Sequence, residues 1–259
     1  MPTPDTALDI RLMNAAARAL FALAMLAFAG LALVWVTRAP MFQIRAIRVE
    51  GDVGRNNAST IRANAATRLA GNFFSIDLTR AQAAFESVPW VRRAVVRRVW
   101  PDRLAVTLEE HRAAAWWHTE EGDDKLVNRQ GEVFEANPGD VEDDGLPTLS
   151  GPDGSSPAML DLYRRLKPVL APLGAQIDTL TLSARGSWTA ELDNGAVIEI
   201  GRGTPQELLA RCDAFVSTLT QVTSRYQRPL EYADLRHRDG YALRLRGVGT
   251  VQPAQKKTN

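Results

Sequence analysis

The sequence predicts an α+β protein with a single N-terminal transmembrane helix and a body of two folded units. Three observations support this prediction. An uncharged apolar run, Ala19 to Thr37, lies between two arginines near the N-terminus. Downstream of the run, apolar residues recur at strand and helix spacings, with turn signals between them. The balance of charge changes sign close to Arg112, which indicates a boundary between two units.

The apolar run has the length of a membrane span, since nineteen residues form a helix of about 28 Å. A cleaved signal peptide is one alternative, because Ala27-Phe28-Ala29-Gly30 resembles a cleavage site. Signal peptides have shorter apolar regions, however, and seven further uncharged residues follow Gly30. A buried core helix is disfavoured by a run of this length without a charge. Trp35 lies near the far end, where interfacial aromatics are typical, so the run is predicted to remain as an anchor.

Charge alone does not orient this anchor, because basic residues flank both of its ends. They are Arg11 and Arg18 on one side, and Arg38, Arg45 and Arg48 on the other. A short N-terminal stub with a long body is the usual signal-anchor arrangement. Residues 1–18 are therefore predicted to be a cytoplasmic stub, residues 19–37 the transmembrane helix, and the body extracytoplasmic.

The charge shift divides the body into residues 40–112 and 113–246. Phe42 to Arg112 holds twelve arginines against seven acidic residues, whereas Ala113 to Ser150 holds two basic residues against ten acidic ones. The whole chain has a net charge of only +1 and lacks a recognised nucleic-acid motif, so nucleic acid is not an expected partner. Residues 247–259 have no apolar period and read as a disordered tail.

The first unit is predicted to have the order β-α-α-β-β. Thr79 and Gln82 have the spacing of a capping box at the start of the second helix, and Pro89 ends that helix. The predicted elements are a strand at Phe42–Glu50, helices at Ala58–Leu69 and Thr79–Val88, and strands at Val91–Trp100 and Arg103–Glu109.

The second unit is predicted to be a mostly antiparallel β domain with two or three helices. Turn signals predict three hairpins, around Arg129-Gln130-Gly131 within Lys125–Phe134, around Asp193-Asn194-Gly195 within Ser187–Ile200, and around Asp239-Gly240 within Tyr232–Arg246.

Two helices of this unit carry clear start signals. Ser156 is predicted to cap a helix whose first residue is Pro157 and which Pro168 disturbs or ends. Thr204 and Glu207 form a capping box for a helix that places Cys212 on its apolar stripe. The apolar stripe of the first helix consists of Met159, Leu160, Tyr163 and Leu166.

No residue pattern in the chain predicts an enzyme, a cofactor or a metal site. The three histidines, His111, His118 and His237, lack metal-ligand spacing. The only cysteine, Cys212, reads as a buried and inert thiol, and no intrachain disulfide is expected. Gly201-Arg202-Gly203 precedes a helix, so it either cradles an anion or is a turn that serves the cap at Thr204.

The order of motifs resembles the FtsQ/DivIB division proteins, in which a POTRA domain follows a signal anchor. The resemblance covers nearly all of the chain from the anchor to about Arg246. The matching residues of the first unit are Pro89-Trp90-Val91, Ala94, Val96, Arg98, Trp100-Pro101, Leu104, Val106, Glu109 and Ala113 to Trp116. Those of the second unit are Val127-Asn128, Gly131, Val133-Phe134, Leu146-Pro147, Leu149, Gly151, Tyr232, Asp234-Leu235-Arg236 and Asp239-Gly240.

This resemblance implies a non-enzymatic scaffold of the divisome. Such proteins sit in the inner membrane of Gram-negative bacteria with the body in the periplasm, concentrated at the division septum. The family binds FtsB and FtsL and, through them, the septal peptidoglycan synthase. FtsK, FtsW and FtsI are further implied partners, and neither a nucleic acid nor a small-molecule substrate is expected.

The resemblance places the FtsB contact on the last strands of the chain. It maps there to Arg236, His237, Tyr241, Leu243 and Leu245. The family often has an aromatic residue directly after the arginine, where this chain has His237, and Tyr241 is an alternative source of that ring. A terminal strand often lies at a sheet edge, where a partner strand can add. The alternative interpretation is that Tyr241, Leu243 and Leu245 simply face the core.

Two other functions remain open at this point. A POTRA-type chaperone or transport subunit would show repeated POTRA units or a C-terminal β-barrel, and neither pattern is visible in the sequence. A membrane-anchored hydrolase of the cell wall would show an acid/base pair or an activated nucleophile.

Overall fold

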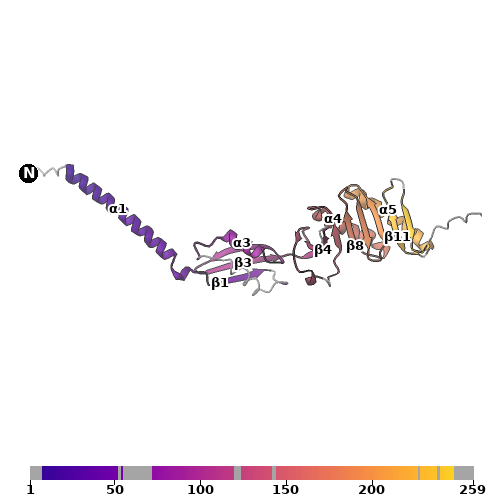
Figure 1. The fold of residues 1–259 in the computed structure, drawn as a ribbon, viewed down its shortest axis with the longest axis horizontal. Helices are drawn as coiled ribbons and strands as arrows, with labels where there is room; N and C mark the ends of the chain where they lie inside the picture. The colour runs from indigo at the N-terminus through magenta and orange to yellow at the C-terminus, as the bar shows by residue number, and fades with distance from the viewer. Residues whose placement is uncertain are drawn as a thin grey trace, which may run out of the picture. The chain divides into compact units, whose positions relative to one another are not determined.

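A computed structural model describes residues 8–51, 54, 72–119, 124–141, 144–226, 228–237 and 240–247 (Figure 1). The chain divides after Glu110 into two compact units, and each is described by itself. The predicted helix at Ala58–Leu69, residue Asp239 of the last predicted turn and the tail beyond residue 247 lie outside the described residues.

The first unit begins with α1, which runs from Leu8 to Thr37. It is long and apolar enough to cross a membrane. Its large apolar side chains are exposed, as expected for a helix whose partner is lipid rather than protein. The helix starts well before Ala19, so residues 8–18 of the predicted stub belong to the same helix.

A three-stranded sheet and one helix make up most of the remaining described part of the first unit. β1 (Ala46–Gly51), β2 (Val91–Val99) and β3 (Arg103–Glu110) lie in the order β1-β3-β2, with β1 parallel and β2 antiparallel to β3. Helix α3 (Leu78–Glu86) packs on β2. The core between helix and sheet contains Phe85, Val88, Val91, Ala94, Val106 and Leu108.

Two details of the first unit differ from the sequence prediction. The strand expected from Phe42 starts only at Ala46, because Pro40–Phe42 form a 3₁₀ turn. The N-cap of α3 is Asp77 rather than Thr79, since its carboxylate accepts hydrogen bonds from the backbone N–H groups of Thr79 and Arg80. An acidic cap competes well with threonine for this position.

The second unit is built on a nine-stranded sheet in the order β12-β11-β10-β9-β8-β7-β4-β5-β6. Helices α4 (Ser156–Leu170) and α5 (Pro205–Tyr226) contact each other, and they pack on β7, β8 and β10, so both cover one face. The strands are β4 (Ala113–His118), β5 (Lys125–Asn128), β6 (Val133–Phe134), β7 (Thr148–Ser150), β8 (Ile177–Leu182), β9 (Trp188–Leu192), β10 (Val197–Gly201), β11 (Leu230–Asp234) and β12 (Ala242–Leu245).

This architecture confirms the predicted α+β class and places the three predicted strand pairs antiparallel. The sequence analysis did not assign β4, β7 or β8, and the pairs β4/β7, β7/β8 and β10/β11 are parallel. The two strands of a parallel pair lie far apart in the sequence, so no local turn signal predicts their pairing.

The start of α4 is also corrected by one residue. Ser155 occupies the N-cap position, and Ser156 is the first helical residue, whose hydroxyl donates to the carbonyl of Gly131 at 2.8 Å. Pro168 lies inside the last turns and does not end the helix, which continues to Leu170. The predicted apolar stripe is buried, and it packs together with the α5 stripe that contains Cys212.

Candidate functional site

The last strand, β12, lies at one edge of the nine-stranded sheet. It pairs with β11 alone, with Leu243 opposite Ala233 and Ala242 opposite Asp234. Within the described part of the chain, no strand pairs with its other side. An edge of this kind presents unsatisfied backbone donors and acceptors to solvent or to a partner.

Hydrogen bonding shows which backbone groups of β12 face the open edge. The N–H of Arg246 donates to the carbonyl of Pro229 at 3.0 Å, so it faces β11. Backbone groups alternate between the two sides of an antiparallel strand. The N–H of Arg244 therefore faces β11, whereas those of Leu243 and Leu245 face the open edge.

The side chains of the predicted contact residues on β12 turn toward the core. Leu245 is 6% exposed, and Tyr241 and Leu243 are half-buried against the core of the unit. The Tyr241 hydroxyl donates to Oγ1 of Thr218 at 2.6 Å, and its ring meets that of Phe215 edge-on at 5.0 Å. The core-facing alternative thus holds for these side chains, and the open edge offers backbone rather than their apolar groups.

Arg236 lies just beyond the end of β11 and is held by a carboxylate of its own chain. Its Nε and Nη2 donate to Oδ1 and Oδ2 of Asp234 at 2.8 and 2.6 Å, a bidentate pair. The backbone N–H of Arg236 also donates to Asp234 Oδ1 at 3.0 Å. These hydrogen bonds lower the pKa of Asp234 to about 2. They also raise the pKa of Arg236.

Three arginines share one cleft of about 380 Å³ beside this pair. Arg202, Arg211 and Arg236 line it together with Ser187 and Gly201. The cleft therefore joins the end of β10, the first half of α5 and the end of β11. Guanidinium groups that converge in this way suit a carboxylate or another acidic group.

The three arginines do not have equal freedom. Arg211 donates to the carbonyls of Ile200 at 2.5 Å and Arg202 at 3.3 Å, so it holds the loop in place. Arg236 is tied to Asp234 but keeps 53% of its side chain exposed. Arg202 is exposed, and none of the described groups bonds its guanidinium. The cation most available to a ligand is thus Arg202.

The Gly201-Arg202-Gly203 segment serves as the turn before α5. The N–H of Thr204 donates to Glu207 at 2.7 Å, and the N–H of Glu207 donates to Thr204 Oγ1 at 3.3 Å, which confirms the predicted capping box. Gly201 has a φ of +89°, and a Cβ there would lie 2.9 Å from Cγ of Arg236. Glycine at this position therefore leaves room for Arg236 in the cleft.

Of the five predicted site residues, Arg236, His237, Tyr241 and Leu243 lie near the end of β11 and the start of β12, whereas Leu245 lies opposite Leu230 at the other end of the pair. The arginine cleft is the main feature that the structure adds to them. His237 follows Arg236 and is exposed. Sequence reasoning missed Arg211 altogether and noted Arg202 only as part of a glycine-flanked turn. The glycine-flanked turn was the one available signal in the sequence. Residues 202 and 236 come together only through the parallel pairing of β10 with β11, which no local pattern predicts.

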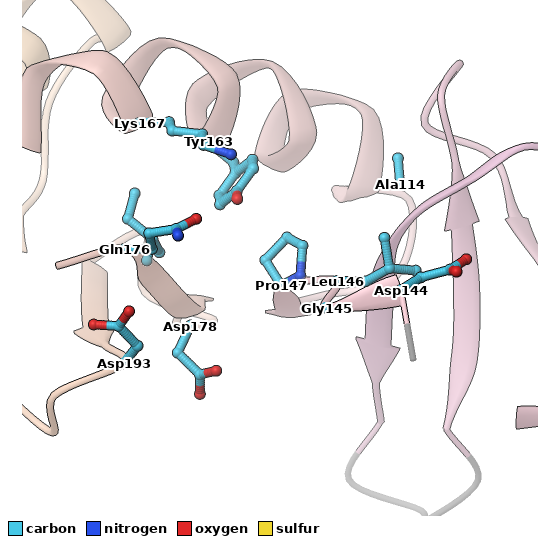
Figure 2. Close-up of a pocket in the computed structure, with 11 residues that line it drawn as sticks. Ala114, Asp144, Gly145, Leu146, Pro147, Tyr163, Lys167, Gln176, Asp178 and Asp193 are labelled. Carbon is cyan, nitrogen blue, oxygen red and sulfur yellow. The ribbon is translucent and has the colours of Figure 1, made fainter. Parts of the chain in front are cut away.

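A second cavity of about 470 Å³ lies near α4 (Figure 2). It is at the opposite strand ends of the second unit from the arginine cleft. Tyr163 and Lys167 reach it from α4, and the loop before β7 lies opposite them. In Figure 2, Asp144 lies at the opposite end from Asp178 and Asp193, so the acidic groups are spread out. The other lining residues are Ala114, Gly145, Leu146, Pro147, Gln176 and Ile177. None of the predicted site residues lines this cavity.

The remaining residues considered for chemistry have structural roles in the described part of the chain. His111 stacks on Phe134 with ring centroids 4.1 Å apart. His118 bonds Asp124 at 2.9 Å on the surface. Cys212 is buried, and desolvation raises the pKa of its thiol to about 12, which keeps it protonated and unreactive. The described His, Cys, Asp and Glu residues form no cluster that could hold a metal ion.

Comparison with known proteins matches both units to family models. Residues 42–111 match the FtsQ-type POTRA domain, and residues 115–236 match the C-terminal region of the cell division protein FtsQ/DivIB. The second match ends at Arg236, so β12 lies beyond it.

Curated relatives match over nearly the whole chain. The chain is 43% identical to cell division protein FtsQ of Burkholderia pseudomallei over 249 residues, covering 96% of this chain and 98% of the relative. It is 39% identical to FtsQ of Thiomonas arsenitoxydans, covering 97% and 92%. It is 37% identical to FtsQ of Bordetella pertussis, covering 92% of each.

Proposed function

Because the chain belongs to the FtsQ/DivIB family of cell division proteins, we propose that it is a non-enzymatic scaffold of the divisome that recruits FtsB and FtsL. In this role it links early division proteins to septal peptidoglycan synthesis, with FtsK, FtsW and FtsI as further partners. The stub is cytoplasmic, α1 spans the inner membrane, and the body lies in the periplasm at the septum.

The observation that carries the partner proposal is the open edge of β12 beside the arginine cleft. A strand of FtsB adds to β12 through the outward backbone groups of Leu243 and Leu245. An acidic residue of FtsB then enters the cleft and pairs with Arg202 and Arg236. Backbone pairing supplies affinity, and the charge pair fixes the register of the added strand.

A proline at position 243 tests the strand addition. Leu243→Pro removes a donor that faces the partner and none that faces β11, so the fold should persist while FtsB binding falls. Leu243→Ala is the matched control, since it loses the same packing but keeps the N–H. The measurement is the amount of FtsB and FtsL that co-purifies with the full chain from membranes. Equal recovery with both variants would exclude this edge as the binding site.

Charge reversal tests the cleft separately. Arg202→Glu should reduce FtsB recovery at least about tenfold, because losing one partner of a charge pair that binding buries costs about 2–5 kcal/mol, and the reversed charge adds repulsion. Arg129→Glu is the control, an exposed arginine in the β5–β6 turn at the opposite edge of the same sheet. If both variants bind alike, the cleft does not contact FtsB.

The proposed topology is tested with reporter fusions. A reporter active only in the periplasm should work when fused after Arg246 and fail when fused after Pro4. Activity of the short fusion alone would reverse the orientation.

A further inference from the structure

The end of α1 is fastened to the base of the first unit by side-chain and backbone hydrogen bonds. The amide of Asn72 donates to the carbonyl of Thr37, the last residue of α1, at 2.6 Å. The same amide's oxygen accepts from the N–H groups of Phe74 and Ser75 at 3.0 Å. The N–H of Phe73 donates to the carbonyl of Phe42 at 2.8 Å. These hydrogen bonds therefore connect the end of α1 to the segment around residue 73.

Four aromatic rings gather at this joint. Phe42 lies 5.0 Å from Phe74 and 5.4 Å from Trp100, and Phe73 lies 5.4 Å from Trp100, measured between ring centroids. Phe42 is only 6% exposed, but Phe74 is 46% exposed and Trp100 is 63% exposed. The neighbouring Met41 is 59% exposed. The cluster is thus closed on one side and presents a large apolar surface on the other.

Two arginines accompany this apolar surface. Arg38 directly follows α1 and is exposed. Arg45 is also exposed, and its backbone N–H donates to the carbonyl of Asp102, close in sequence to Trp100. We call the surface of Met41, Phe74 and Trp100 with these two arginines the base patch.

We propose that the base patch lies in the headgroup layer of the bilayer that α1 spans. Tryptophan favours this layer because its ring is amphipathic, and arginine side chains are attracted to anionic lipid headgroups there. Met41 is the fourth residue after Thr37, so it lies within about 14 Å of the helix end even with the chain fully extended. The hydrogen bond from Asn72 shortens this tether further.

This inference rests on the proposed membrane anchoring of α1 and goes beyond it. Anchoring alone attaches the first unit to the membrane only through the end of α1 and the hydrogen bonds around Asn72. Insertion of the base patch gives that unit a second attachment to the membrane, which sets its tilt relative to the bilayer. The other conceivable occupants are a protein partner and a second copy of the chain.

Lipid-borne nitroxide quenchers can locate the patch in the full chain. Phe74→Cys is labelled with a small fluorophore, and the protein is placed alone in nanodiscs whose lipids carry the nitroxide on the headgroup. Cys212 needs no replacement because it is buried. Arg93→Cys is the matched control, an exposed position on β2 six residues from Val99, about 20 Å further along the strand. Ala29→Cys, in the middle of α1, is paired with nitroxide on the acyl chain.

The three labels separate the possible outcomes. Quenching at position 74 should exceed that at position 93 about threefold or more, because position 74 lies in the base patch whereas position 93 lies about 20 Å along β2 from Val99, the residue next to Trp100 of the patch. Equal quenching at 74 and 93, with position 29 quenched, would overturn the inference and leave the anchor intact. Absence of quenching at position 29 would overturn the anchoring itself. A photo-crosslinker at position 74 should attach to phospholipid in native membranes, and attachment only to a protein would also overturn the inference.

Discussion

At the scale of single residues, the pair of Asp234 and Arg236 organises the end of β11. Its two parallel hydrogen bonds fix the direction of a guanidinium that borders the arginine cleft. The side chain that a partner would meet is therefore pre-oriented, and less of its rotational freedom is lost on binding.

The pKa of Asp234 gives this pair a measurable signature. Its folded-state pKa of about 2 lies below the ordinary value, which is about 3.9 in an unfolded chain. The stabilisation is therefore complete above pH 4 and is lost as the pH falls from about 4 to about 2. The melting-temperature difference between wild type and Asp234→Asn should shrink over that range.

Arg236→Ala provides the matching test of cause. Without the guanidinium, the pKa of Asp234 should rise toward its ordinary value, because the hydrogen bonds from Arg236 are the main reason for its depression. Carboxyl NMR titration of labelled aspartate measures this directly. A pKa that stays near 2 in the variant would mean that other groups depress it.

Gly201 is the other residue whose identity shapes the cleft. Gly201→Ala places a methyl group 2.9 Å from Cγ of Arg236 and forces alanine into a positive φ, which costs of order 1–3 kcal/mol. Gly186→Ala is the control, because its φ of +78° is similar and its added Cβ meets nothing. Denaturant unfolding should show a larger loss for Gly201→Ala, and equal losses would mean that Arg236 moves aside freely.

At the scale of elements, hydrogen bonds rather than sequence patterns decide where the helices start. Asp77 caps α3, although Thr79 and Gln82 have capping-box spacing. The amide of Gln82 instead donates to Glu86 at 2.9 Å. The Thr204 and Glu207 pair, with the same type of pattern, does form its box. A spacing rule alone does not separate the two cases, because the competing acceptor lies outside the pattern.

The competing caps of α3 are separated by two alanine variants. Asp77→Ala should lower the stability of the first unit by about 1 kcal/mol, the usual cost of losing an N-cap acceptor. Thr79→Ala should change it much less, since its side chain does not cap the helix. Denaturant unfolding followed by a probe in the first unit measures both. A larger loss from Thr79→Ala would restore the capping box read from the sequence.

At the scale of the whole molecule, each unit has a buried core of its own. The core of the first unit lies between α3 and its sheet, and that of the second lies between α4, α5 and the large sheet. Leu166 is fully buried in the second core, and Val106 is fully buried in the first. The body thus consists of two separately packed structures on one chain.

Core truncations should therefore act on one unit each. Leu166→Ala should destabilise the second unit by about 2–5 kcal/mol, and Val106→Ala should destabilise only the first. Hydrogen exchange of the full chain reports both units in one experiment. Loss of protection in both units from either single variant would show that they unfold as one.

The sequence by itself determined the features that depend on neighbours along the chain. Nineteen uncharged residues between arginines suffice to predict the membrane-spanning part of α1, and the Asp193-Asn194-Gly195 turn suffices to pair β9 with β10. The same local motifs carried the resemblance to FtsQ/DivIB, which the comparisons confirm. Only the tertiary structure decided which strand lies at the edge, which side of β12 faces inward, and that Arg202 and Arg236 line the same cleft. The parallel pairing of β10 with β11 joins segments separated by α5, and contacts of that range depend on the packing of the whole sheet rather than on any local pattern.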